Sequence, residues 1–180
     1  FGMSNDWFFA PDPDGIDANC DGIDGELGKS VFVAKTGDDT GLGTIDDPLR
    51  TLQAGIAKAA AQSKRDVLVA TGVYVESIAL ANKVNVYGGY SPDFGQRDRF
   101  THESAILGVD PSDALRGAVN AQAIANGAAN AVVFDGFSVF GADNANPGGN
   151  SYAIYLREVG PNLTVSNNVI VAGNGGNGSA

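Results

Sequence analysis

The sequence predicts an all-β fold of the solenoid type, in which short strands repeat along one axis. Residues 67–90 contain three short apolar runs, and Thr71-Gly72 and Asn82-Lys83 separate these runs, so no helix fits there. The chain also has 25 glycines, which together with its many asparagines are typical of a chain with many tight turns. One coil of this kind cannot bury its own core, so we expect further coils to follow it.

Side-chain direction within residues 67–90 follows from the period of a strand. Alternate residues point to the same face of a sheet, so one set faces a shared core and the other faces outward. We expect Ser77, Lys83 and Asn85 to face solvent. The residues expected to point into the core are Val67, Val69, Ile78, Leu80, Val84 and Val86.

The composition restricts the partners that the chain can bind. The net charge is −10 at pH 7 and the sequence pI is near 4.3, which excludes nucleic acid and anionic membranes, because phosphate binding needs clustered Lys and Arg. No window reaches the roughly 20 apolar residues of a membrane-spanning helix, so we expect no membrane insertion. Divalent cations are the more natural partners of such an acidic chain.

The cysteine content and the two ends add little about the cell compartment. The single cysteine, Cys20, permits neither an intrachain disulfide nor a four-thiolate zinc site. The first residues lack the basic and apolar regions of an export signal, and we expect the chain to be a piece of a longer protein. Residues 1–10 are aromatic and are expected to pack as an arm on the domain or on a neighbour, with an exposed partner-binding patch as the alternative.

Residues 1–29 are predicted to be an acidic lead-in, and residues 30–180 the solenoid. Oxygen-bearing side chains crowd the lead-in so closely that they would repel one another unless a hard cation lay among them. The spacing Asp17-x-Asn19-x-Asp21-Gly22 matches the opening of an EF-hand loop, but Gly28 stands where the bidentate glutamate belongs. The segment is more similar to the Asp-rich calcium repeats of the thrombospondin type 3 kind. The predicted Ca²⁺ ligands are Asp12, Asp14, Asp17, Asn19, Asp21, Asp24 and Glu26, and the alternative is a solvated acidic linker.

The start of the solenoid is predicted as a strand at residues 30–35, a turn-rich loop at 36–47 and one helix at about 48–62. Asp47 is placed as the N-cap and Pro48 at the first helical position. Apolar residues recur at spacings of three and four along the helix and give it one apolar stripe. We expect this helix to cover the open end of the solenoid core, as terminal repeats must.

Beyond the first coil, the sequence alternates polar insertions with short strands. Residues 91–104 form a polar loop in which Arg97, Arg99 and His102 lie near carboxylates. An elimination on a polyuronate would use Ca²⁺ and an arginine base, but we favour a structural turn here. Further strands are expected around residues 118–124 and at 132–134, 137–140, 152–156, 163–165 and 169–171.

The order of these elements resembles a known superfamily. VFVAKTGDDTGLGTIDDPLRTLQAGIAKA, then DVLVATGVYVESIAL, VNVYGGYSPDFGQRD and AILG are similar to the N-terminal portion of pectate-lyase-like proteins. Large surface or secreted proteins of Gram-negative bacteria, including the polymorphic outer-membrane type, are the more similar members. The resemblance, which covers residues 30–108 best, implies a right-handed parallel β-helix with an N-terminal capping helix. It implies no activity, because the superfamily includes lyases, hydrolases, adhesins and inert passengers.

The function expected from these observations is structural or adhesive. We expect a non-catalytic, extracellular or cell-surface solenoid that is stabilised by Ca²⁺ and associates with copies of itself as an oligomer or filament, since an open last coil favours stacking. No catalytic residue is assigned. One alternative is a polysaccharide lyase or another enzyme acting on acidic glycans, and a second is a non-catalytic carbohydrate-binding module that contacts a surface glycan through aromatic side chains.

Overall fold

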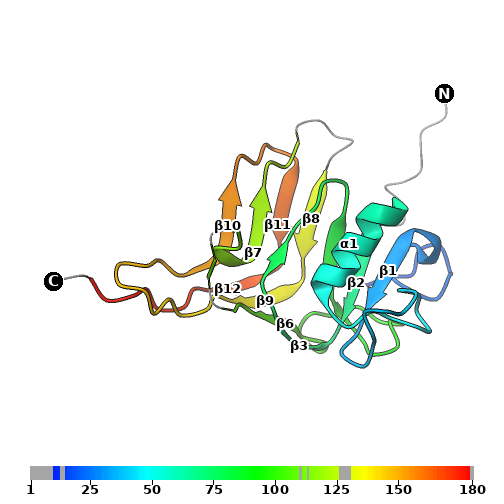
Figure 1. The fold of residues 1–180 in the computed structure, drawn as a ribbon. Helices are drawn as coiled ribbons and strands as arrows, with labels where there is room; N and C mark the ends of the chain where they lie inside the picture. Colours follow the sequence, from blue (N-terminus) through cyan, green and yellow to red (C-terminus); the bar gives the residue numbers. More distant parts are fainter. Residues whose placement is uncertain (1–9, 13–14, 110, 113, 126–130, 179–180) are drawn as a thin grey trace.

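The protein is a parallel β-solenoid closed at one end by a helix (Figure 1). The computed structural model describes residues 10–12, 15–109, 111–112, 114–125 and 131–178. Within these residues every pairing between named strands is parallel, and one α-helix is present. The predicted all-β, parallel solenoid with a single helix is therefore confirmed. The predicted aromatic arm at residues 1–10 lies almost entirely outside the described residues.

Three sheets make up the solenoid, and the complete coils, from β2 to β10, pass through sheets A, B and C in turn. Sheet A has the order β1 (Ser30–Val33), β2 (Asp66–Ala70), β5 (Asn85–Tyr90), β8 (Val132–Asp135) and β11 (Leu163–Ser166). Sheet B has the order β3 (Gly72–Val75), β6 (Ser104–Leu107), β9 (Phe137–Phe140) and β12 (Val169–Val171). Sheet C has the order β4 (Ile78–Ala79), β7 (Gly117–Gln122) and β10 (Tyr152–Arg157).

The coil boundary differs from the predicted one. The three apolar runs of residues 67–90 do not close one coil, because β5 lies on β2 with Val86 opposite Val67 and so begins the next coil. The run at residues 74–80 is divided into β3 and β4, since the chain turns at Glu76 and Ser77 to pass from sheet B to sheet C. The strands predicted farther along the chain are confirmed as β7 to β12.

The inner core follows the predicted alternation. All six residues expected to point inward are buried in one cluster that runs along the axis of the solenoid. Phe134 and Phe137 stack within this cluster with ring centroids 4.7 Å apart and ring planes 7° apart. Side chains from all three sheets and from the helix therefore contribute to one continuous core, as a solenoid requires.

A second core covers the outer face of sheet A. Phe32, Leu68 and Tyr87 form a row across β1, β2 and β5 and point away from the inner core. Ile23 of the lead-in and Phe94 of the loop at residues 91–103 pack on this row and bury it. Where this row lies, β1, β2 and β5 are thus apolar on both faces, as in sheets that are covered on both sides.

The residues expected to face solvent divide into two groups. Lys83 is exposed, as predicted, and it adopts a left-handed backbone conformation with φ of 66°. Ser77 is instead buried, because its Oγ accepts a hydrogen bond from the Val109 backbone. Asn85 is half-buried: its side chain donates to Asp66 on β2 and accepts from the Val133 backbone on β8. Bonds between neighbouring coils explain both corrections.

The helix α1 (Leu52–Gln62) closes the first coil, but it begins later than predicted. Thr51 is the N-cap, and its hydroxyl accepts a hydrogen bond from the Ala54 N–H. Asp47 is therefore not the N-cap, and its carboxylate instead accepts from the Leu42 N–H. The helix cannot begin at Pro48, because the next residue, Leu49, is extended and pairs with Val33 along the free edge of β1.

Candidate functional site

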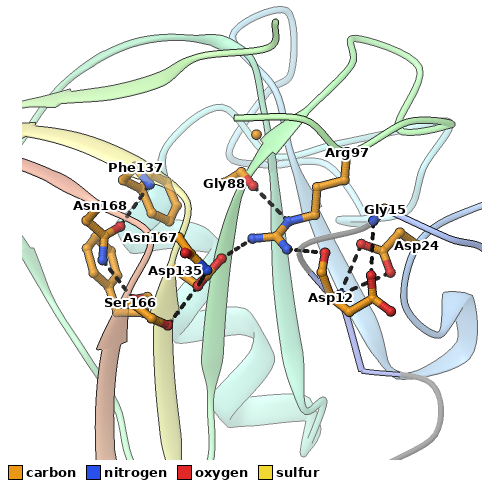
Figure 2. Close-up of polar contacts among 12 residues, drawn as sticks. Asp12, Gly15, Asp24, Gly88, Arg97, Asp135, Phe137, Ser166, Asn167 and Asn168 are labelled. Carbon is orange, nitrogen blue, oxygen red and sulfur yellow. Dashed lines mark hydrogen bonds and ion pairs between the residues drawn. The ribbon is translucent and has the colours of Figure 1, made fainter. Parts of the chain in front are cut away.

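A buried arginine joins three separate parts of the chain on the outer side of sheet A (Figure 2). Arg97 lies in the loop at residues 91–103, and its Nε donates to the Gly88 carbonyl at 3.0 Å. Its Nη1 donates to the Asp12 carbonyl of the lead-in at 2.8 Å, and its Nη2 forms an ion pair with the carboxylate of Asp135. A single side chain thus connects the lead-in, the second coil and the third coil.

Asp135 extends this network to the last coil. Its second carboxylate oxygen accepts hydrogen bonds from the Ser166 Oγ and the Asn167 Nδ2, each at 2.7 Å. The Arg97 side chain is only 6% exposed and that of Asp135 only 8% exposed, so the pair is well shielded from water. Among the described residues, no buried side-chain nitrogen or oxygen lacks a hydrogen-bond partner. The charges are therefore compensated within the fold, which a buried ion pair needs if it is to be tolerated.

Two glycines leave room for the Arg97 side chain where neighbouring coils meet. At Gly136, which has φ of +86°, an added Cβ would lie 2.9 Å from Nη2 of Arg97 and 2.8 Å from the carbonyl oxygen of Gly88. At Gly88, an added Cβ would lie 2.7 Å from the carbonyl oxygen of Gly136. The chain turns from sheet A to sheet B at this corner, and a side chain at either glycine would separate the two coils.

The lead-in carries a second buried carboxyl group close to Arg97. Asp24 is 2% exposed, and both of its carboxylate oxygens lie within hydrogen-bond distance of the Asp12 N–H, at 3.2 and 3.3 Å. Burial raises the pKa of Asp24 from its ordinary value of 3.8 to about 7, although the charge of Arg97 acts in the opposite direction. The hydroxyl of Tyr90 donates to the Asp24 backbone carbonyl at 2.6 Å and fixes the segment on sheet A.

In this structure the side chains predicted to bind Ca²⁺ mainly accept hydrogen bonds from backbone N–H groups. Asp17 accepts from the N–H groups of Asp21 and Gly22, and Asp21 accepts from those of Ile23 and Leu27. These bonds shape the turns of the lead-in. The same loop contains the amide of Asn19, which bonds to Asp21 and Gly25, and the carboxylate of Glu26, which pairs with Lys29 at 3.3 Å.

The geometry does not assemble a metal-ligand group from these side chains. In the part of the chain that the structure describes, no three His, Cys, Asp or Glu residues are grouped so that they could hold an ion. Asp14 lies outside the described residues, and the carboxylate of Asp24 lies beside Asp12, near Arg97 (Figure 2). Ca²⁺ binding by the lead-in therefore remains a prediction from the sequence.

The polar loop at residues 91–103 is bonded mainly to itself and to sheet A. The carboxylate of Asp98 accepts from the Phe100 N–H and the Thr101 hydroxyl. The guanidinium of Arg99 lies over the ring of Phe100, with its carbon 4.0 Å from the ring centroid. Arg97 is buried as described above, so its guanidinium has no free position over a groove.

Sequence reasoning missed the partner of Arg97. The pair joins positions 38 residues apart, and the insertion at residues 91–103 hides the stacking of β8 on β5. One signal was present in the sequence: Gly88 within β5 and Gly136 directly after β8 lie at the same corner of successive coils. Aligning the coils on these glycines would have placed Asp135 beside the loop that carries Arg97.

A polar hollow of about 480 Å³ lies between the loops beside β7 and β10. Tyr152 and Tyr155 pack edge to face near it, with ring centroids 5.4 Å apart, and the Arg116 guanidinium carbon lies 5.7 Å from the Tyr155 ring centroid. Asn150 donates from its side chain to the Tyr152 hydroxyl at 3.1 Å. The polar residues that line the hollow are Ser112, Arg116, Asn144, Asn146, Asn150 and Tyr152.

No family model, curated protein or solved structure matches the chain. In the described residues, no helix is both long enough and apolar enough to span a membrane.

Proposed function

We propose that this protein is a non-catalytic structural or adhesive solenoid that acts outside the cell or at its surface. The observation that supports this proposal most strongly is the burial of Arg97 together with its hydrogen bonds. This residue is one of the two arginines considered as a catalytic base, yet it is buried and donates to two carbonyls and one carboxylate that hold the coils together. A group with these bonds stabilises the fold and is not available to take a proton from a substrate.

The position of the acidic residues also supports a scaffold role. A lyase that uses Ca²⁺ needs carboxylates beside its base in a groove that the substrate can enter. In this chain the acidic residues of the lead-in form turns against sheet A, and the outer face of that sheet is filled by Ile23, Phe94 and their neighbours. The right-handed, pectate-lyase-like character of the fold is part of this proposal and rests on the resemblance of residues 30–108.

The last coil supports the proposed self-association. In the described residues β10, β11 and β12 each pair with one strand only, so this edge of each sheet can accept a further strand, either from a continuation of the chain or from a second copy. Val165 on β11, Ile170 on β12 and Leu156 on β10 are exposed at these edges. Strand edges of this kind favour the addition of further strands. At the other end, α1 and residues 43–49 cover β1, which opposes growth of a filament in both directions.

An assay for unsaturated uronide products tests the proposal directly. We expect no product from pectate, alginate or heparin in millimolar Ca²⁺, over the range of protein and substrate concentrations in which a known lyase gives a clear signal. Parent protein, Arg97→Lys and Arg99→Lys should be indistinguishable in this assay. Product formation by the parent that is lost in either variant would replace the scaffold proposal with the lyase alternative.

A glycan-binding role is the second candidate, and the polar hollow favours it. Side-chain amides and a tyrosine ring are suited to the hydroxyl groups and the apolar face of a sugar. The other aromatic residues considered for this role, such as Tyr74, Tyr87 and Phe134, are buried. Binding on a glycan array that Tyr152→Ala abolishes, and that Val73→Ala on a different face retains, would support this function. If the parent bound no glycan on the array, the glycan-binding function would be ruled out.

A further inference from the structure

The segment that follows β12 carries the same short sequence twice. Gly173-Asn174-Gly175 and Gly176-Asn177-Gly178 have the same neighbours on both sides of the asparagine. An asparagine followed by glycine is open to deamidation, because glycine has no side chain to hinder attack by its backbone nitrogen on the asparagine side chain. A further Asn-Gly pair, Asn126-Gly127, lies outside the described residues. Since the local sequences are alike, a difference in reactivity between the two repeats must come from the structure.

The backbone surroundings of the two asparagines are also alike. Residues 171–177 run beside residues 141–149 and continue the stacking of β12 on β9 (Figure 1). The carbonyls of Asn174 and Asn177 each accept a hydrogen bond from a backbone N–H of the facing segment, at 2.9 and 2.7 Å. Both asparagines are exposed to water. The backbone N–H that follows each asparagine donates to no acceptor among the described residues, so both nitrogens are available as nucleophiles.

The two repeats differ in what holds the asparagine side chain. One carboxylate oxygen of Asp143 accepts hydrogen bonds from the Asn174 N–H at 2.6 Å and from the Asn174 Nδ2 at 3.1 Å. These hydrogen bonds lower the pKa of Asp143, which is therefore ionised at neutral pH. Hydrogen bonds to an ionised group are stronger than those between neutral groups. The side chain of Asn177, in contrast, forms no hydrogen bond within the part of the chain that the structure describes.

We propose that Asn177 is a site of spontaneous deamidation and that Asp143 protects Asn174 from the same reaction. The backbone nitrogen of Gly178 attacks Cγ of Asn177 and closes a five-membered succinimide ring. Its proton leaves with the side-chain nitrogen as ammonia. Water then opens the ring at either carbonyl and leaves aspartate or isoaspartate, which adds one negative charge to the chain. This inference goes beyond the proposed scaffold role and does not depend on it.

Asp143 opposes the reaction at Asn174 in two ways. The carboxamide must turn toward the Gly175 nitrogen, and this movement breaks its hydrogen bond to Asp143. Negative charge also develops on the side-chain oxygen of Asn174 during the attack, and an ionised carboxylate close by disfavours that charge. Neither effect acts on Asn177, because no carboxylate holds its side chain among the described residues.

Peptide mapping by mass spectrometry, after long incubation of the folded protein at mildly alkaline pH, tests the proposal. We expect Asn177 to deamidate at least about fivefold faster than Asn174, because hydrogen bonds to an ionised group must break before Asn174 reacts. The product at Asn177 should contain both aspartate and isoaspartate. In urea the two sites should react at similar rates, since their neighbours in the sequence are the same.

Variants of Asp143 separate its effect from that of the segment as a whole. Asp143→Ala should raise the rate at Asn174 to about that at Asn177 and leave the rate at Asn177 unchanged. Asp143→Asn keeps an acceptor without the charge and should give an intermediate rate at Asn174. Asp93→Ala is the matched control, because it removes an exposed carboxylate from another loop and should change neither rate. A circular dichroism melt confirms that each variant is folded.

Several outcomes would overturn the proposal. Equal rates at Asn174 and Asn177 in the folded protein would do so, as would an unreactive Asn177 in the folded protein when the sample in urea reacts. A slower reaction of Asn174 in Asp143→Ala would show that Asp143 acts as a base and not as a protecting group. Aspartate without isoaspartate would mean that water attacks the side chain directly, and the succinimide step would be wrong.

Discussion

Arg97 has the chemistry of a catalytic residue but the surroundings of a structural one. Three groups from separate parts of the fold accept its hydrogen bonds, and the ring centroids of Tyr87 and Tyr90 lie 5.3 and 5.8 Å from its guanidinium carbon. Each of these contacts holds the guanidinium in place and removes it from water. At the scale of the residue, function must therefore be judged from burial and bonding, because residue type alone would have suggested an enzyme.

Asp24 leads to a prediction about pH. Since burial raises its pKa from 3.8 to about 7, the folded chain holds this proton more tightly than the unfolded chain does. The contribution of Asp24 to the free energy of unfolding is therefore largest at low pH and is lost as the pH rises from about 4 to about 7. Asp24→Asn mimics the protonated form, so it should raise the melting temperature above that of the parent at pH 8 and change it little at pH 4.

Thermal melts of both proteins across this pH range, in the presence of chelator, measure the difference. Chelator ensures that no cation competes for the carboxylate. Asp93→Asn is a suitable control, because Asp93 is exposed and hydrogen bonds lower the pKa of its carboxyl. If the difference between Asp24→Asn and the parent did not grow with pH, Asp24 would be ionised in the folded protein and the account of its burial would be wrong.

At the scale of the element, the lead-in is a cover for sheet A. Its carboxylates accept backbone N–H groups, and Ile23 enters the outer core. Replacing Asp17, Asn19 and Asp21 together by alanine should therefore lower the melting temperature even in chelator, because several turn hydrogen bonds are lost at about 0.5–1.5 kcal/mol each.

The same variant tests the Ca²⁺ prediction. If Ca²⁺ binds the lead-in, millimolar Ca²⁺ raises the melting temperature of the parent, and the triple variant does not show this rise. Replacing Asp38 and Asp39 in the next loop leaves the Ca²⁺ response intact. If Ca²⁺ did not change the melting temperature of the parent, the lead-in would be a hydrogen-bonded cover of sheet A, and the prediction that it binds Ca²⁺ would be wrong.

The helix α1 provides a second prediction at this scale. An added Cβ at Gly55 would lie 2.5 Å from Cγ2 of Val33 and 3.1 Å from Cγ1 of Val67, both in the inner core. Alanine is favoured over glycine in a helix by about 1 kcal/mol, but overpacking a core costs about 1–3 kcal/mol. Gly55→Ala should therefore lower the free energy of unfolding in a urea titration.

The control for this prediction lies on the exposed side of the same helix. Ala57→Gly should lose about 0.5–1 kcal/mol through helix propensity alone. Stabilisation by Gly55→Ala would mean that α1 is not packed closely on β1 and β2. The predicted role of the helix as the cover of the first coil would then need revision.

At the scale of the whole molecule, local pattern predicted the strands, the helix and the inner core. Alternation of apolar residues placed Val67, Val69 and Val86 in the core, and turn residues marked the strand ends. These features depend on neighbours in the sequence, so a single sequence contains them. The same reasoning misplaced the coil boundary, because the runs of residues 67–90 look alike whether they complete one coil or begin the next.

Features that depend on long-range contacts could not be predicted. The outer core of sheet A needs Ile23 and Phe94 to return to the sheet across many residues, and nothing local indicates this. The helix start was wrong because Leu49 pairs with Val33, a contact that overrides the favourable Asp47-Pro48 signal. The Arg97–Asp135 pair is of the same kind, since it depends on how the insertion at residues 91–103 folds back.

The melting temperature of Arg97→Ala, compared with that of Arg99→Ala, tests the central claim most directly. Removing one partner of a buried ion pair costs about 3–5 kcal/mol, which for a chain of this size lowers the melting temperature by about 6–20 °C. The account predicts a fall in this range for Arg97→Ala and a change of only a few degrees for Arg99→Ala, whose side chain lies over Phe100. An unchanged melting temperature in Arg97→Ala would show that Arg97 does not hold the coils together, and would contradict the structural role proposed for it.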